Sequence, residues 1–155
     1  MNGIEKYLAI AELLVDFFKA VGYCDNACHS IMQGSRVKSC CGEEICRSKG
    51  IYDWESELEI FRAKISENNR YRVKPNSFLS DTGCILGKYK PVHCTVYACK
   101  ELEEHIKDEF DISFDHKKLL DDIEFVHDEG GFNSFDALKK NIENMIFKVK
   151  KQKNI

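Results

Sequence analysis

The sequence predicts a mainly α-helical fold, organised as a single small helical domain over residues 1–155 with irregular cysteine-rich loops. Apolar residues recur at intervals of three and four in several segments, which is the pattern of helices with one buried face. The chain has 155 residues, of which 43% are hydrophobic, so it can bury the core of one globular domain. Its eight cysteines fall into two clusters, and helical spacing is lost around the first of them.

The first predicted helix lies between Asn2 and Gly22. Asn2 and Glu5 have the spacing of a capping box, in which each side chain bonds the backbone N–H of the other residue. Gly22 is placed to end the helix. We expect this helix to pack on the core, with docking to a protein partner as the alternative. Its apolar stripe consists of Ile4, Tyr7, Leu8, Ala11, Leu14, Val15 and Phe18.

Four further apolar stripes follow, separated by loop-rich stretches at residues 23–50 and 66–92. The second helix has Asp53 as its expected N-cap, and the fourth has Asp115. The third helix begins near Cys94–Cys99, and the last begins at Ser134. The stripes, in chain order, are Trp54, Leu58, Phe61 and Ile65; Leu102 and Ile106; Leu119, Leu120, Ile123 and Val126; and Phe135, Leu138, Ile142, Met145, Ile146 and Val149.

The clustered cysteines are the candidate metal ligands. Zinc and iron–sulfur clusters are both held by thiolates, usually four for each site. Eight cysteines can fill two such sites, and a shared or partly open site is equally allowed. Without a metal, the segment at residues 23–50 could not bury enough apolar surface to stay ordered. The candidate ligands are Cys24, Cys28, Cys40, Cys41, Cys46, Cys84, Cys94 and Cys99.

Composition and charge exclude several classes of protein. Charged residues interrupt the apolar run in residues 1–23, so this stretch does not have the pattern of a signal peptide, and no segment is apolar enough to cross a bilayer. We therefore expect a cytoplasmic protein with no membrane contact, in which disulfides are rare. The net charge of -3 gives no general attraction to nucleic acid. The basic run Lys148–Lys153 is expected to be a frayed helix end.

The second cysteine cluster has a more specific spacing than the first. Cys94 lies ten positions after Cys84, and Cys99 lies five positions after Cys94. The segment resembles the C-terminal signature of the CxxCxxCC family, the YkgJ-like zinc- or iron-chelating proteins with their flagellin lysine-N-methylase-like relatives. The family pattern is C-P-F-L, a short turn, G-x-C, and then R-P-x-x-C-x-x-Y/F-P-C. The matching residues are Phe78, Leu79, Gly83, Cys84, Pro91, Cys94, Tyr97 and Cys99.

The resemblance covers roughly residues 24–100 and implies that the cysteines chelate metal. The first cluster departs from the family pattern, because eleven residues separate Cys28 from the adjacent pair Cys40–Cys41. Asn76 stands where the pattern has a cysteine, and Lys90 stands where it has an arginine. Cys46 is an extra cysteine, which either replaces the missing ligand or stays free.

Histidines offer a second class of ligand. His29 and His93 lie next to cysteines, and zinc accepts imidazole as a ligand. The plainer expectation is that each of them supports the thiolate ligands or lies on the surface. His105, His116 and His127 lie among charged residues on predicted helices and are expected to face solvent.

Three functions follow from these patterns. The first is a metal-binding protein that holds zinc or an iron–sulfur cluster, in which the helices recognise a protein partner or none. The second is an iron–sulfur enzyme, either an oxidoreductase or a methylase-like protein. The third, a disulfide-bonded secreted or redox protein, is disfavoured by the missing export signal and the adjacent Cys40–Cys41 pair.

Overall fold

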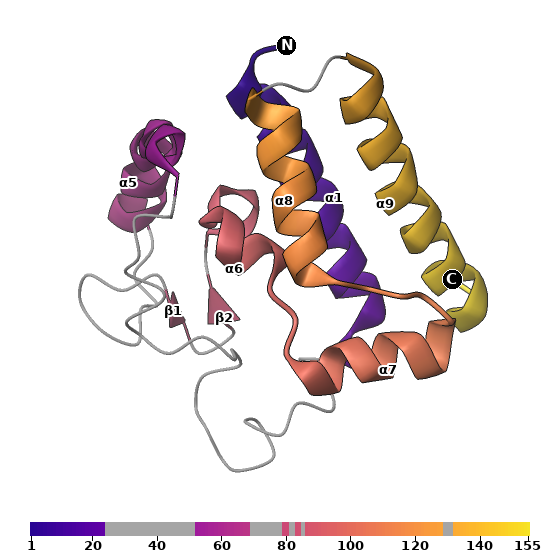
Figure 1. Cartoon of the computed structure of the whole chain (residues 1–155). Helices are drawn as coiled ribbons and strands as arrows, with labels where there is room; N and C mark the ends of the chain where they lie inside the picture. Colours follow the sequence, from indigo (N-terminus) through magenta and orange to yellow (C-terminus); the bar gives the residue numbers. More distant parts are fainter. Residues whose placement is uncertain (24–51, 69–78, 81–82, 85, 129–131) are drawn as a thin grey trace. The chain divides into compact units, whose positions relative to one another are not determined.

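The computed structural model describes residues 1–23, 52–68, 79–80, 83–84, 86–128 and 132–155. This part of the chain is mainly helical, which confirms the predicted fold class (Figure 1). The chain divides into two compact units: the first unit consists of Met1–Gly22 and Thr95–Ile155, and the second of Tyr23–Cys94. That they form a single domain stays a prediction. Of the loop-rich stretch predicted at residues 23–50, all but residue 23 lies outside the described residues. Of the one predicted at residues 66–92, residues 69–78, 81–82 and 85 lie outside them.

Helix α1 (Gly3–Val21) has both of its predicted ends. The N–H of Glu5 donates to Asn2 Oδ1 at 2.9 Å, and the N–H of Asn2 donates to Glu5 Oε2 at 2.8 Å, which completes the capping box. Gly22 ends the helix at φ 68°, a left-handed conformation that glycine adopts without strain.

The buried face of α1 differs in part from the predicted stripe. Tyr7, Ala11 and Leu14 are buried as expected, but Ile4, Leu8, Val15 and Phe18 are only half-buried. Apolar residues surround most of this helix, so their spacing does not distinguish one face from the next. The buried residues are Tyr7, Ile10, Ala11, Leu14, Phe17 and Val21.

Three more helices complete the first unit: α7 (Lys100–Phe110), α8 (His116–Asp128) and α9 (Phe132–Lys153). Figure 1 shows α1, α8 and α9 side by side. Lys153 Nζ donates to the carbonyl of Val21 at 2.6 Å, which joins the end of α9 to the end of α1. Gly3, at the start of α1, lies so close to His127 near the end of α8 that an added Cβ would be 2.6 Å from Nε2. Helices α1 and α9 therefore run in the same direction, and α8 runs against both.

Aromatic and aliphatic side chains from all four helices form the core of the first unit. Phe17 stacks on Phe114 with ring centroids 5.5 Å apart. The hydroxyls of Tyr7 and Thr95 are hydrogen-bonded at 2.9 Å in a buried position, which ties α1 to the point where the chain re-enters this unit. The apolar stripes predicted for α7, α8 and α9 supply buried residues as expected, namely Leu102, Ile106, Leu119, Ile123, Val126, Phe135, Leu138, Ile142 and Val149.

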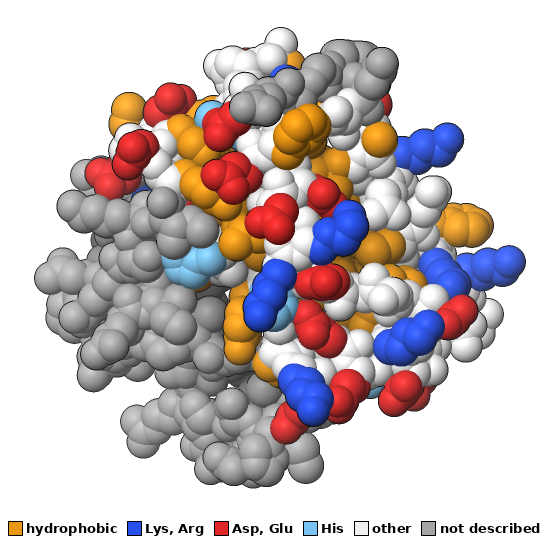
Figure 2. Space-filling model, in the orientation of Figure 1, with side chains coloured by type: hydrophobic (Ala, Val, Ile, Leu, Met, Phe, Trp, Pro, Cys, Tyr) orange, Lys and Arg blue, Asp and Glu red, His pale blue; other side chains and the backbone are white. Residues whose placement is uncertain are grey.

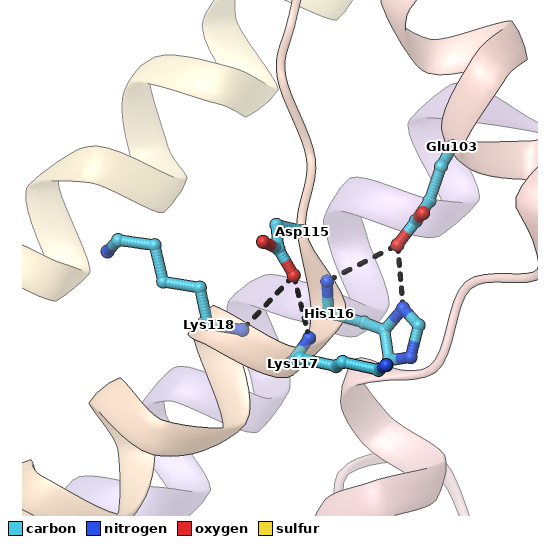
Figure 3. Close-up of polar contacts among 5 residues, drawn as sticks. All are labelled: Glu103, Asp115, His116, Lys117 and Lys118. Atoms are coloured by element: carbon cyan, nitrogen blue, oxygen red, sulfur yellow. Dashed lines mark hydrogen bonds and ion pairs between the residues drawn. The ribbon is translucent and has the colours of Figure 1, made fainter.

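The start of α8 has a partner for each of its first backbone N–H groups (Figure 3). Asp115 Oδ1 accepts the N–H groups of Lys117 and Lys118 at 3.0 and 3.2 Å, which confirms the predicted cap. The N–H of His116 donates to Glu103 Oε1 of α7 at 3.3 Å. The same oxygen lies 2.6 Å from His116 Nδ1, so Glu103 fixes both the helix start and the imidazole.

The basic C-terminal run is ordered helix, so the expectation of a frayed end was wrong. Helix α9 continues to Lys153, whose ammonium bonds the Val21 carbonyl. Lys148 Nζ donates to the carbonyl of Asp111 at 2.8 Å. Long basic side chains here bond the last carbonyls of neighbouring helices, where cations are favoured.

The second unit contains η1 (Asp53–Leu58), a 3-10 helix that leads directly into α5 (Glu59–Asn68). Tyr52, rather than the predicted Asp53, is the N-cap. Of the predicted stripe Leu58 is fully buried, but Phe61 is 37% exposed and stacks on Tyr89 at 5.0 Å. The tighter winding of the 3-10 segment shifts the buried face, so that Glu55 and Arg62 are buried instead.

The rest of the second unit leads toward the second cysteine cluster. Strands β1 (Leu79–Ser80) and β2 (Gly83–Cys84) pair antiparallel, with Leu79 opposite Cys84. The 3-10 helix η2 (Gly87–Tyr89) follows, and then the short helix α6 (Val92–Val96).

Positive and negative side chains alternate over the described part of the face in Figure 2. Exposed ion pairs form within single helices, such as Lys118 Nζ with Asp122 Oδ2 at 2.8 Å in α8. No helix in the described ranges is both long and apolar enough to span a bilayer.

Replacing Asp115 with alanine should destabilise the protein by about 0.5–2 kcal/mol, because two N–H groups at the start of α8 lose their acceptor. The free energy of unfolding from urea titrations measures this. Asp121→Ala, at an exposed position of the same helix, is the matched control, and equal losses in the two variants would contradict the capping role.

Asp111 should add stability that depends on pH. A hydrogen bond from Lys107, together with the charges of Lys107 and Lys148, lowers its pKa below the ordinary 3.8. This contribution is complete above 3.8 and is lost as the pH falls through the lower folded-state pKa. Asp111→Asn, which tolerates the left-handed backbone at φ 51°, should therefore lower the urea midpoint at pH 6 and have no effect at pH 2. A loss that persists unchanged at pH 2 would contradict this assignment.

Candidate metal centre

The structure describes the second cysteine cluster better than the first. Cys94 and Cys99 are half-buried, and Cys84 is described through its backbone in β2. Cys94 lies on α6 in the second unit, and Cys99 is the N-cap of α7 in the first unit. The remaining predicted ligands lie outside the described residues: Cys24, Cys28, Cys40, Cys41 and Cys46.

The helix that carries Cys94 begins on a buried carboxylate. Val92 is the first residue of α6, and its N–H, which no residue within the helix can accept, donates to Glu55 Oε1 at 2.6 Å. The other carboxylate oxygen, Oε2, accepts the N–H of Tyr52 at 2.9 Å. Glu55 is 0% exposed and its bond to Val92 is buried, so an unmet polar group at that point would be costly, whereas the bond to Tyr52 is part-buried. The N–H of Cys94 then donates to the carbonyl of Pro91 at 2.9 Å and closes the turn.

The buried side chain of Arg62 holds the same turn at a second point. Arg62 of α5 is 4% exposed, and its Nε donates to the carbonyl of Tyr89 at 2.7 Å. Glu55 and Arg62 thus form hydrogen bonds to the backbone at Val92 and at Tyr89, the residues that flank Lys90 and Pro91. We call residues 89–94, held in this way, the Cys94 turn.

His93 lies within the Cys94 turn. Its Nδ1 is buried and has no hydrogen-bond partner among the described residues. Burial lowers the pKa of His93 below its ordinary 6.5; the negative charge of Glu55 opposes this shift, and the positive charge of Arg62 adds to it. The imidazole is therefore held in its neutral form at neutral pH, which is the form that binds a metal.

Cys99 occupies a position that favours the thiolate. It precedes the first turn of α7, with an extended backbone at φ -68° and ψ 162°, and its carbonyl accepts the N–H of Glu103 at 3.0 Å. The positive end of the helix dipole lowers the energy of a negative sulfur at this point. Lys100, the next residue in the chain, is exposed, and its Nζ lies 3.7 Å from Glu104 Oε1 in an ion pair.

The three helical histidines do not face solvent as predicted, because each is half-buried. His105 and His127 contact Phe110 and Asp128, respectively. His116 is held by Glu103 and meets the ring of Tyr97 edge-on at 5.6 Å (Figure 3). Since Glu103 also accepts the first N–H of α8, we assign this pair to helix docking rather than to chemistry.

Within the described ranges, no group of three or more His, Cys, Asp or Glu side chains is arranged to hold a metal ion. Comparison with protein-family models found no family that matches the chain, and comparisons with curated proteins and with solved structures found no similar protein.

Glu55 and Arg62 were not predicted from the sequence as residues of the site. A signal for them exists: Glu55, Leu58 and Arg62 are spaced by three and four, so two charged residues share one helical face with a buried leucine. A charged pair on an apolar face indicates a buried polar contact whose partner lies elsewhere in the chain. The partner, a backbone N–H some 37 residues away, has no sequence signature of its own.

Replacing Glu55 with alanine should cost at least about 1–3 kcal/mol in the free energy of unfolding, because the buried N–H of Val92 loses its acceptor. The part-buried N–H of Tyr52 loses its acceptor as well and adds a smaller cost. Glu55→Gln keeps one acceptor oxygen and should lose less. Glu57→Ala, exposed on the same 3-10 helix, is the matched control and should change stability by under about 0.5 kcal/mol. A Glu55→Ala variant as stable as this control would contradict the role of the carboxylate.

Proposed function

We propose that this protein is a cytoplasmic metal-binding protein whose clustered cysteines chelate zinc or an iron–sulfur centre. The observation that carries the proposal is the spacing of Cys84, Cys94 and Cys99, together with the glycine, proline and tyrosine that accompany them. Reduced thiols are the form that binds metal, and the cytosol keeps them reduced. We also propose that the chain belongs to the CxxCxxCC chelating proteins, the family that the motif resembles.

The described residues of the second cluster support the proposal through their local chemistry. Cys99 stands at a helix N-terminus, where a thiolate is favoured. Cys94 stands on a turn whose backbone is fixed by two buried side chains before any metal is bound. A ligand fixed in advance loses less conformational freedom when it binds, which strengthens binding. When bound, zinc would supply structural cross-links among these thiolates, and an iron–sulfur centre would supply electron transfer.

Anaerobic purification followed by metal analysis and a visible spectrum tests the proposal. Zinc without visible absorption supports a structural metal, whereas iron with acid-labile sulfide and a redox-responsive brown colour supports the iron–sulfur form. A chain that holds neither metal and shows no titratable thiols would refute the proposal in favour of disulfides.

Replacing Cys94 with serine should release metal and lower stability, because metal binding contributes directly to folding free energy. Metal content per chain and the thermal midpoint measure the two effects. Cys46→Ser is the informative companion: retention of metal would show that Cys46 is not a required ligand. Unchanged metal content in Cys94→Ser itself would remove Cys94 from the ligand set.

A further inference from the structure

His93 poses a physical problem that the cysteines do not explain. Its Nδ1 is buried, and no donor or acceptor among the described residues meets it. Buried polar atoms in folded proteins almost always have a partner, because leaving one without a partner is destabilising. An atom of this kind indicates a group that occupies the site in the working protein, such as an ordered water or a bound ion.

The backbone that carries the ring is held by two buried side chains. Glu55 bonds the N–H of Val92, immediately before His93, and Arg62 bonds the Tyr89 carbonyl. Both oxygens of Glu55 accept backbone N–H groups. The next residue in the chain is Cys94, a thiol on the same short helix. A partner for Nδ1 therefore lies at the turn that also carries this thiol.

We infer, on the basis of the proposed metal-binding function, that His93 Nδ1 is a ligand of a metal ion bound at the Cys94 turn. A neutral imidazole that carries its proton on Nε2 presents a lone pair at Nδ1, which suits a divalent ion. Glu55 and Arg62 both bond the backbone of this turn, so a carboxylate and a guanidinium of opposite charge lie beside the site. Mixed thiolate and imidazole ligands are common for zinc, whereas most iron–sulfur clusters have only thiolates, so this ligand favours zinc.

X-ray absorption at the edge of the metal that the purified protein holds tests the inference directly. Zinc–nitrogen distances are about 2.0–2.1 Å and zinc–sulfur distances about 2.3 Å, so the two ligand types are resolved. The native protein should show nitrogen as well as sulfur around the metal. His93→Ala should lose one nitrogen and weaken metal affinity by roughly tenfold or more, measured by competition with a chelator, whereas His105→Ala should change neither quantity.

His93→Cys keeps the inference testable if the alanine variant does not hold its metal. A thiolate can replace the imidazole as ligand, so this variant should bind metal again, with one nitrogen fewer and one sulfur more. A native protein with sulfur alone around its metal would overturn the role of His93 and leave the proposed function standing. If both His93 variants keep as many nitrogen ligands as the native protein, the nitrogen comes from another residue. That result also overturns the role of His93. A native protein without metal would refute the proposed function itself.

Discussion

The hydrogen bond between the Val92 N–H and the buried carboxylate of Glu55 is the constraint on which the described second unit depends. A five-residue helix such as α6 is too short to form alone, because nucleation costs more than so few internal bonds return. Glu55 supplies the missing acceptor from a distant part of the chain, and Arg62 holds the preceding turn. Burying a carboxylate is costly, and the two backbone N–H groups that Glu55 accepts offset part of that cost.

The first unit also contains a carboxylate that accepts the first N–H of a helix, but there the bond contributes less to stability. Glu103 accepts the first N–H of α8 much as Glu55 accepts that of α6, but its side chain is 29% exposed. Water competes for a half-exposed carboxylate, so the bond to His116 adds less than its length suggests. The stability of this unit comes mainly from apolar packing, such as the stack of Phe17 on Phe114. A hydrogen bond from the first N–H of a helix to a carboxylate therefore contributes more to the second unit than to the first.

Local features of the sequence predicted the helices well, and distant contacts limited the prediction of the site. Asn2, Gly22 and Asp115 act on their immediate neighbours, so residue type and spacing were enough to identify them as caps. The role of Glu55 depends on a partner far along the chain, and the pKa of His93 is lowered by burial and modulated by the charges of Glu55 and Arg62, which lie more than thirty residues before it in the sequence. The lysines of α9 show the same limit, because Lys153 is ordered by the carbonyl of Val21, at the far end of the chain. Whether the eight cysteines bind metal stays a prediction.

The first unit consists of two stretches that are far apart in the sequence, and this affects how the chain folds during synthesis. The chain leaves this unit at Gly22 and returns at Thr95, where the buried bond to Tyr7 ties it to α1. During translation α1 emerges first but has no partners until α8 and α9 have followed it out of the ribosome. All eight cysteines, from Cys24 to Cys99, emerge during that interval, before α8 and α9 can complete the first unit. The cysteines of the proposed metal site are therefore synthesised before the first unit can finish folding.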